Sequence, residues 1–270
     1  MADRGVDTGY VQRNEHPTRD VLVTRTLEGD RHFAGFGATS TEDYADCFLK
    51  ASELPVKVIS ESQVLVSGTL GLAYPGSGDA ILAAVSAAKS KHNTTVVIDI
   101  NWRPVFWKDS TRAKEVILDF IKAADVLKLT DEEAEWLYGI PAGEALAHPA
   151  KVLEVLPSVQ GVLVSAGEKG SSYSFRCPGG KLDVSGEVAV LPVKVEDTTG
   201  AGDAYLSGFI FYMLLCGGLK GLMADPGKLL RAVQFATACG AATCKRAGAI
   251  NAQPTVQEVE DLLREAGLNL

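Results

Sequence analysis

Residues 196–203 read Glu196-Asp197-Thr198-Thr199-Gly200-Ala201-Gly202-Asp203, and an apolar run over residues 204–216 follows them. Glycines at 200 and 202 let the backbone turn sharply and approach a ligand closely. The apolar run predicts a helix. A helix that begins directly after such a turn presents free N–H groups and the positive end of its dipole, which favour a phosphate or a developing anion.

Asp203 lies in the first turn of this predicted helix. Its carboxylate can stabilise the helix through charge alone, or it can take a proton from a hydroxyl group that attacks a bound phosphate. For the short Gly-Ala-Gly-Asp string, the structural interpretation is favoured, because glycine-rich turns before helices are common.

The longer string resembles the C-terminal signature of the ribokinase-like (pfkB) carbohydrate kinases. The matching positions are Asp197, Thr199, Gly200, Ala201, Gly202, Asp203, Ser207, Gly208, Phe209 and Ile210. This resemblance implies transfer of the γ-phosphoryl group of ATP to a sugar hydroxyl. It further implies that Asp203 is the base and that the amides of residues 200–202 form the anion hole.

Short β-rich runs alternate with helical segments from residue 63 onward, which predicts a parallel sheet covered on both faces. Ligands are then expected at the carboxyl ends of the strands. The predicted strands are residues 64–67, 95–99, 125–129, 161–165 and 171–175, and the predicted helices are residues 78–90, 111–124, 132–138, 150–156 and 229–245. A capping box from Thr255 to Glu258 predicts a last helix that ends near Gly267.

Two further strand-like runs, residues 21–26 and 31–36, flank Leu27-Glu28-Gly29-Asp30 and predict a hairpin within about residues 20–40. From the residues alone it is an ordinary edge hairpin. The family resemblance implies a small β lid over the sugar, attached to a ribokinase-like three-layer α/β/α fold. We therefore expect one domain over residues 1–270.

Composition limits the function classes. The chain is 46% hydrophobic and 22% charged with a net charge of −8, which argues against nucleic-acid binding. No apolar run reaches the roughly 18 residues of a membrane span. The N-terminus lacks a signal-peptide pattern, so we expect a cytoplasmic protein, or a plastid one if a longer form carries a transit peptide.

Scattered cysteines and histidines predict reduced thiols and no zinc site: Cys47, Cys177, Cys216, Cys239 and Cys244; His16, His32, His92 and His148.

Asp99, Asn101 and Arg103 follow the end of a predicted strand. Such side chains can bind a polyol and a phosphate, or they can form a turn closed by Pro104. With Trp107, they resemble the Asp-x-Asn-x-Arg-x-x-x-Trp segment of fructokinases and ketodeoxygluconate kinases. That resemblance favours a sugar over a nucleoside as substrate.

Thr130 and Glu133 follow the next strand and have the spacing of a helix capping box. The family resemblance implies instead that this pair binds Mg²⁺ and phosphate through water. Thr130 stands where most relatives have Asn. A single carboxylate such as Glu133 is adequate, because Mg²⁺ retains several waters.

The loop with Ser165, Gly167 and Gly170 can approach a nucleotide or form a plain turn into the next strand. It resembles the nucleotide loop of the family. Thr237, on a small-residue face that core packing alone would explain, stands near the position where relatives contact adenine.

A monovalent cation site next to the anion hole is also implied by the resemblance, and we expect it to hold K⁺. Its residues would be Asp197 and Thr199 together with backbone carbonyls around Thr243, Arg246 and Gly248.

The opening of the family pattern, a strand ending in a sugar-binding Asp and then Gly-Gly-x-x-x-Asn, has no match before Val21. We therefore expect an N-terminally shortened chain that phosphorylates sugars poorly on its own and forms a homodimer through the lid. The alternatives are a non-catalytic scaffold or regulatory protein of the same fold, or a kinase for another small polyol or a nucleoside.

Overall fold

The computed structural model describes residues 2–25, 31–37, 40–91, 94–176 and 183–268. By its internal contacts the chain divides into two compact units. The first comprises Met1–Val23 and Phe33–Ala124, and the second comprises Thr24–His32 and Asp125–Leu270. The expectation of one domain over residues 1–270 stays a prediction.

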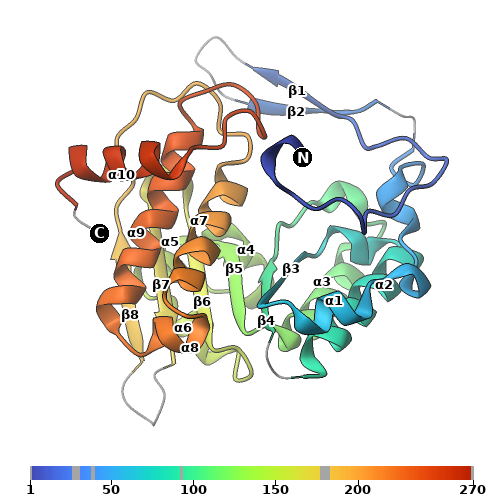
Figure 1. Ribbon diagram of the computed structural model, residues 1–270, viewed down its shortest axis with the longest axis horizontal. Helices are drawn as coiled ribbons and strands as arrows, with labels where there is room; N and C mark the ends of the chain where they lie inside the picture. The colour runs from blue at the N-terminus through green and yellow to red at the C-terminus, as the bar shows by residue number, and fades with distance from the viewer. Residues whose placement is uncertain (1, 26–30, 38–39, 92–93, 177–182, 269–270) are drawn as a thin grey trace. The chain divides into compact units, whose positions relative to one another are not determined.

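The first unit contains a parallel pair of strands, β3 (Val64–Gly68) and β4 (Thr95–Asp99) (Figure 1). The register pairs Gly68 with Asp99, so both strands end at the same edge. Its helices are α1 (Val56–Glu61), α2 (Pro75–Lys89) and α3 (Ser110–Phe120), and its short 3₁₀ turns are η1 (Ala2–Arg4), η2 (Ala45–Phe48), η3 (Ala51–Glu53), η4 (Leu70–Ala73), η5 (Pro104–Phe106) and η6 (Ile121–Ala123). Helix α2 begins three residues earlier than expected because Pro75 occupies its first turn, where proline is well tolerated.

A two-stranded sheet forms from β1 (Val21–Arg25) and β2 (Arg31–Phe36), which confirms the two strands of the predicted hairpin. The expected turn at residues 27–30 lies outside the described residues. Val21 and Leu22 are exposed on β1.

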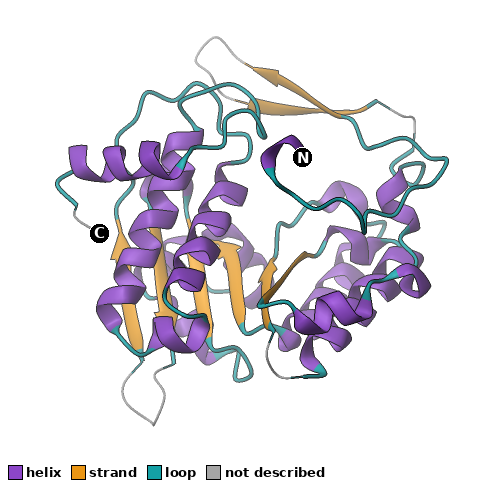
Figure 2. Cartoon of the chain, in the orientation of Figure 1, coloured by secondary structure: helices purple, strands orange, loops and turns teal. Residues whose placement is uncertain are grey.

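The second unit is built on β5 (Val126–Thr130) and β6 (Gly161–Ser165), which are parallel, and on β7 (Ser171–Phe175) and β8 (Val184–Val188), which are antiparallel additions. Consecutive residues of β5, β6 and β7 are buried, so helices cover both faces of these strands (Figure 2). The helical elements are α4 (Asp131–Tyr138), α5 (Ala142–Ala147), α6 (Pro149–Glu154), η7 (Gly167–Lys169), α7 (Ala201–Leu215), α8 (Leu219–Met223), α9 (Pro226–Thr243) and α10 (Val256–Glu265). The mostly parallel, three-layer arrangement is therefore confirmed.

Helices α7 and α9 lie side by side (Figure 1). Small residues allow their close approach: a Cβ on Gly208 would lie 2.6 Å from the Cys239 sulfur, and one on Gly240 would lie 3.2 Å from the Ala201 carbonyl oxygen. Close helix packing is thus the observed use of the small-residue face of α9.

Cys47 and Cys239 are buried free thiols, whereas Cys216 and Cys244 are only half-buried. Cys177 and His92 lie outside the described residues. Within the described chain, no helix combines the length and the apolar character that crossing a membrane requires.

The core of the second unit supplies a stability test. Phe209 on α7 is fully buried and stacks on Phe175 of β7, with 5.9 Å between ring centroids. Phe209→Ala should destabilise the protein by about 3–5 kcal/mol, because it removes apolar contacts and leaves a cavity. Leu215→Ala on the same helix, where the side chain is 69% exposed, is the matched control. In urea unfolding, the free energy of unfolding should fall strongly for Phe209→Ala and only slightly for Leu215→Ala. Equal losses in the two variants would contradict this packing.

Candidate active site

The turn before α7 places the first residues of that helix at the surface. Gly200 adopts the left-handed conformation (φ 80°, ψ 2°), and a Cβ there would lie 3.2 Å from the Cβ of Ala249. The Ala204 amide makes the first bond of the helical ladder, to the Gly200 carbonyl at 2.8 Å. The ladder therefore leaves the earlier amides of the first turn to other acceptors. Gly202 and Asp203 are both exposed there.

The Ala201 amide is the exception within this turn, because it donates to the Thr198 carbonyl at 3.2 Å. Each amide has one proton to give, so the N–H groups of Gly202 and Asp203 are better placed for a ligand than that of Ala201. The helix also begins at Ala201, three residues before the predicted apolar run.

Asp197 holds the turn in place. Its carboxylate is 5% exposed and accepts from the amide and the hydroxyl of Thr199, at 2.9 and 2.6 Å, through Oδ1. Its Oδ2 accepts from the amide of Gly248 at 2.9 Å. The structure thus brings together three of the residues expected around a cation: Asp197, Thr199 and Gly248.

The other two residues of that expected site use their side chains elsewhere. The Thr243 hydroxyl donates to the Cys239 carbonyl at 2.9 Å inside α9. The Arg246 guanidinium forms a bidentate pair with Glu258, at 2.7 and 3.3 Å, in the first turn of α10. Only their backbone carbonyls could therefore serve a cation, as the family resemblance implies.

Lys128 is a residue of this site that sequence analysis missed. It is 5% exposed on β5, and its Nζ lies 3.5 Å from the position that a Cβ on Gly202 would take. A lysine inside the apolar strand run Val126-Leu127-Lys128-Leu129 was the available signal, since lysine is rarely buried without a specific reason. Its ammonium adds positive charge at the N-terminus of α7.

Thr130 and Glu133 form the predicted capping box of α4. The Thr130 hydroxyl accepts from the Glu133 amide at 3.1 Å, and the Glu133 carboxylate accepts from the Thr130 amide at 2.7 Å. Glu133 is buried. The adjacent Asp131 accepts from Lys169 of the loop after β6 at 3.5 Å, which ties α4 to that loop.

The loop that starts at Ser165 is a tight turn into β7. Gly167 and Gly170 have positive φ angles of 53° and 99°, and the Ala166 amide donates to the Gly170 carbonyl at 2.9 Å. A Cβ on Gly170 would lie 2.5 Å from the Val188 carbonyl, so glycine is required there for packing alone. This geometry is that of the predicted turn, and the nucleotide contact stays a prediction.

Thr237 is buried on α9, next to Ser171, the first residue of β7. Its hydroxyl donates to the Val233 carbonyl at 2.8 Å and lies 3.0 Å from the Ser171 hydroxyl. The expected contact of Thr237 with adenine also stays a prediction.

The motif of Asp99, Asn101 and Arg103 belongs to the first unit, so the structure does not relate it to the residues above. Asp99 is buried at the end of β4, whereas Arg103 is exposed and donates to the Trp102 carbonyl at 2.7 Å. Asn101 has a φ of 46°, the one positive value at a non-glycine among the described residues. Strained backbone of this kind gathers at functional sites.

A parallel-stranded α/β fold with an exposed helix N-terminus beside a carboxylate and a lysine defines an anion-binding α/β protein. The sequence profile described as pfkB family carbohydrate kinase matches residues 1–256. The chain therefore belongs to the pfkB family of carbohydrate kinases, which confirms the resemblance noted in the sequence.

Its relatives include plant proteins. The chain is 34% identical over 246 residues to the probable fructokinase-6, chloroplastic, of Arabidopsis thaliana, covering 91% of this chain and 60% of that protein. It is 31% identical over 274 residues to fructokinase-1 of Zea mays, covering 98% and 77% of the two chains. The chain thus spans between about three-fifths and three-quarters of these relatives' length.

Solved structures show the same fold. A fructokinase from Xylella fastidiosa with bound ATP superposes with a TM-score of 0.82 at 24% identity, covering 98% of this chain and 80% of that one. A fructokinase from Vibrio cholerae O395 in a form with fructose, ADP and calcium ion gives a TM-score of 0.77 at 24% identity, covering 97% and 79%. A putative ribokinase II from E. coli gives 0.75 at 23% identity, covering 93% and 72%. These likenesses establish the ribokinase-like fold.

The turn before α7 can be tested by a pair of glycine substitutions. Gly200→Ala introduces a left-handed alanine and a contact with Ala249, so it should destabilise the protein by about 2 kcal/mol or more. Gly217→Ala is the matched control, because φ is also positive (84°) but no atom lies within 4 Å of its added Cβ. Its loss should be limited to the conformational cost of about 1–2 kcal/mol. Equal losses in urea unfolding would show that the close approach to Ala249 is unimportant.

The pairing of Arg246 with Glu258 predicts a pH dependence. The Arg246 guanidinium, followed by the Thr255 amide, lowers the pKa of Glu258 from 4.5 to about 2. A lowered carboxyl pKa contributes stability above pH 4.5 that is lost as the pH falls toward 2. The thermal midpoint of Glu258→Gln should therefore lie below that of the wild type at neutral pH and converge with it across this window.

The effect should be modest, because the Glu258 side chain is 44% exposed. Asp261→Asn, which removes an exposed pair with Arg264 on the same helix, is the control and should change the midpoint less. A constant difference between Glu258→Gln and the wild type from neutral pH to pH 2 would contradict the lowered pKa.

Proposed function

We propose that this chain catalyses ATP-dependent phosphorylation of a sugar hydroxyl, as its fructokinase relatives are named for doing. The observation that carries the proposal is the exposed first turn of α7, where the Asp203 carboxylate stands beside the amides of Gly202 and Asp203. A kinase of this type needs an anion site next to a base, and this turn would supply both.

Asp203 would accept the proton of the attacking hydroxyl. The N-terminal amides of α7 would stabilise the negative charge on the transferring phosphoryl group, and the Lys128 ammonium beside Gly202 would add to this stabilisation. Catalysis would therefore depend on positioning and electrostatics.

Mg²⁺ and K⁺ both suit the donors of the second unit. Glu133 offers a buried carboxylate that can act through water, and Mg²⁺ bound with the phosphates would neutralise part of their charge. The Asp197 carboxylate is already oriented by Thr199 and Gly248, and a carboxylate has about four acceptor sites, so it can also face K⁺. Carbonyls around Thr243 and Arg246 would complete that site.

The remaining motif residues would bind the nucleotide and the sugar. The turn with Ser165, Gly167 and Gly170 would face ATP, with Thr237 near the base. Asp99, Asn101 and Arg103 would bind the sugar, and the strained Asn101 backbone supports a binding role for that loop. No structural observation favours the scaffold or nucleoside-kinase alternatives. The compartment and a homodimer through the hairpin remain predictions.

The test is removal of the base. Asp203→Ala should lower sugar-dependent ADP release by about 10²–10⁴-fold, because a positioned base contributes that much. The variant should still be stabilised by ATP with Mg²⁺ in a thermal-shift assay, since the amides remain. Asp119→Ala, which removes an 80% exposed carboxylate of α3, is the control and should retain activity. Near wild-type turnover by Asp203→Ala would overturn the assignment.

A further inference from the structure

A largely buried arginine lies at the base of the hairpin. Arg19 comes just before β1, and its side chain is only 11% exposed. The guanidinium carbon lies 4.5 Å from the ring centroid of Tyr44, 4.8 Å from that of Phe106, 5.1 Å from that of Phe36 and 5.9 Å from that of Tyr74. All four distances are within the range of cation–π attraction. We call these five residues the Arg19 cage.

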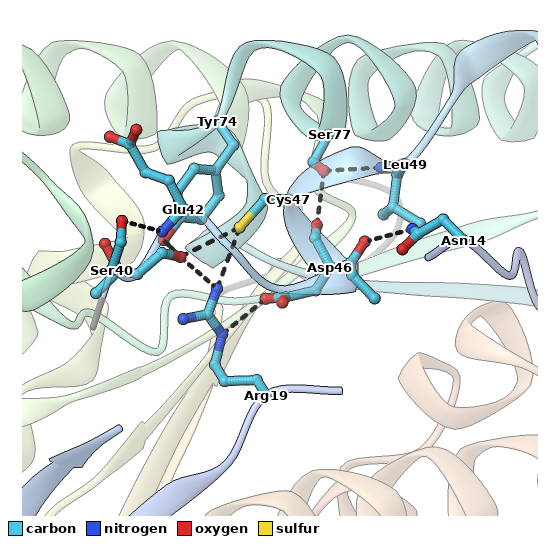
Figure 3. A network of polar contacts seen from close by, with 11 residues as sticks. Asn14, Arg19, Ser40, Glu42, Asp46, Cys47, Leu49, Tyr74 and Ser77 are labelled. Carbon is cyan, nitrogen blue, oxygen red and sulfur yellow. Dashed lines mark hydrogen bonds and ion pairs between the residues drawn. The ribbon is translucent and has the colours of Figure 1, made fainter. Parts of the chain in front are cut away.

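Polar contacts fix the plane of the guanidinium (Figure 3). Its Nε donates to Asp46 Oδ2 at 2.9 Å, and Nη2 donates to the Thr41 carbonyl at 3.0 Å and to the Cys47 sulfur at 3.2 Å. Nη1 is buried and has no hydrogen-bond partner within the described part of the chain. A buried donor without a partner costs free energy, so stability alone does not account for this arrangement.

The cage joins the hairpin to two loops of the first unit. Arg19 and Phe36 both lie at the base of the hairpin, where β1 begins and β2 ends, while Tyr74 directly precedes α2 and Phe106 lies in η5. Phe106 contacts both Phe36 and Tyr74, with ring centroids 5.4 and 6.4 Å apart. The η5 turn directly follows Arg103, the last residue of the candidate sugar motif.

A two-stranded hairpin is at best marginally stable without packing against other elements. The position of β1 and β2 therefore depends on contacts at their base, and the Arg19 cage supplies side-chain contacts there. An arginine suits this task because its flat guanidinium stacks on rings and donates in fixed directions, whereas lysine is a point charge.

We propose that Arg19 is a positioning residue that fixes the base of the hairpin against the loop carrying Asp99, Asn101 and Arg103, and thereby sets the affinity for the sugar. The part of this inference that concerns the sugar rests on the proposed function. The part that concerns the base of the hairpin rests on the contacts of the Arg19 cage, whose five residues all belong to the first unit.

The first experiment measures hydrogen exchange of the ligand-free protein by mass spectrometry. In Arg19→Met, peptides from β1 and β2 should exchange about tenfold faster or more, because loss of the cation–π and hydrogen-bond contacts of the guanidinium favours local opening. Peptides from β6 should be unchanged. Asn14→Ala, which removes a contact to the Ala45 carbonyl on the same segment but outside the cage, is the matched control and should leave the hairpin unchanged.

The second experiment measures kinetics with fructose and ATP. Arg19→Met should raise the KM for fructose about tenfold or more, while kcat and the KM for ATP stay within about twofold, because only substrate positioning is changed. Arg19→Lys should not restore the fructose KM. Asp46→Asn is a milder change, because it alters the 53% exposed ion-pair partner of Arg19. It should shift the hairpin exchange rate and the fructose KM in the same direction, and it replaces Arg19→Met if that variant does not fold.

If the hydrogen-exchange rate of the hairpin is unchanged in Arg19→Met, the inference is overturned, whatever the activity. If Arg19→Met does not fold, Asp46→Asn takes its place in this test. Faster exchange with an unchanged fructose KM overturns the link to the sugar. A wild-type protein without fructose-dependent turnover refutes the proposed function instead, and the exchange measurement still decides whether Arg19 positions the hairpin.

Discussion

The buried carboxylate of Asp197 is the constraint on which the candidate phosphate site depends. A charge removed from water is tolerated only when hydrogen bonds replace its solvation, and Asp197 obtains these from Thr199 and Gly248. The amides of Glu196 and Asp197 also donate to the Cys244 carbonyl, at 2.8 and 3.3 Å. These bonds fasten the turn before α7 to the segment after α9. The direction in which the first amides of α7 point is therefore set by contacts distant in sequence.

Several residues combine a structural role with a proposed chemical one. Glu133 caps α4, and the glycines at 167 and 170 are required by the turn into β7. Geometry of this kind is compatible with both interpretations, because a group that is fixed by packing is also preorganised for a ligand. Membership of the pfkB family, rather than the local geometry, is what gives the chemical interpretation more weight for these residues.

The sequence predicts β3 to β6 well because each is a short, largely apolar run, whereas β7 contains three serines and is recognised by its place between two glycine-containing segments. It misses α5, a helix of six residues that follows Pro141, and β8, a five-residue strand that contains a glycine and only two apolar side chains. Neither offers the sustained run of apolar residues on which such predictions rest. The capping boxes at Thr130 and Thr255 were predictable because their contacts span three residues. The ammonium of Lys128 beside Gly202 and the Arg19 cage were not, since contacts between distant segments determine them.

Asp197 is a buried charge and Arg19 a largely buried one, but their hydrogen-bonding groups are satisfied to different degrees. Asp197 accepts through both oxygens, whereas Arg19 relies partly on ring faces and leaves Nη1 without a partner among the described residues. A fully bonded buried charge favours a single geometry strongly, while an incompletely satisfied one costs less to release. Segments that must move during binding come from the less stable parts of a protein. On the proposed function, the turn that holds the phosphate site should stay rigid, and the hairpin, which is expected to cover the sugar, should be the segment that opens.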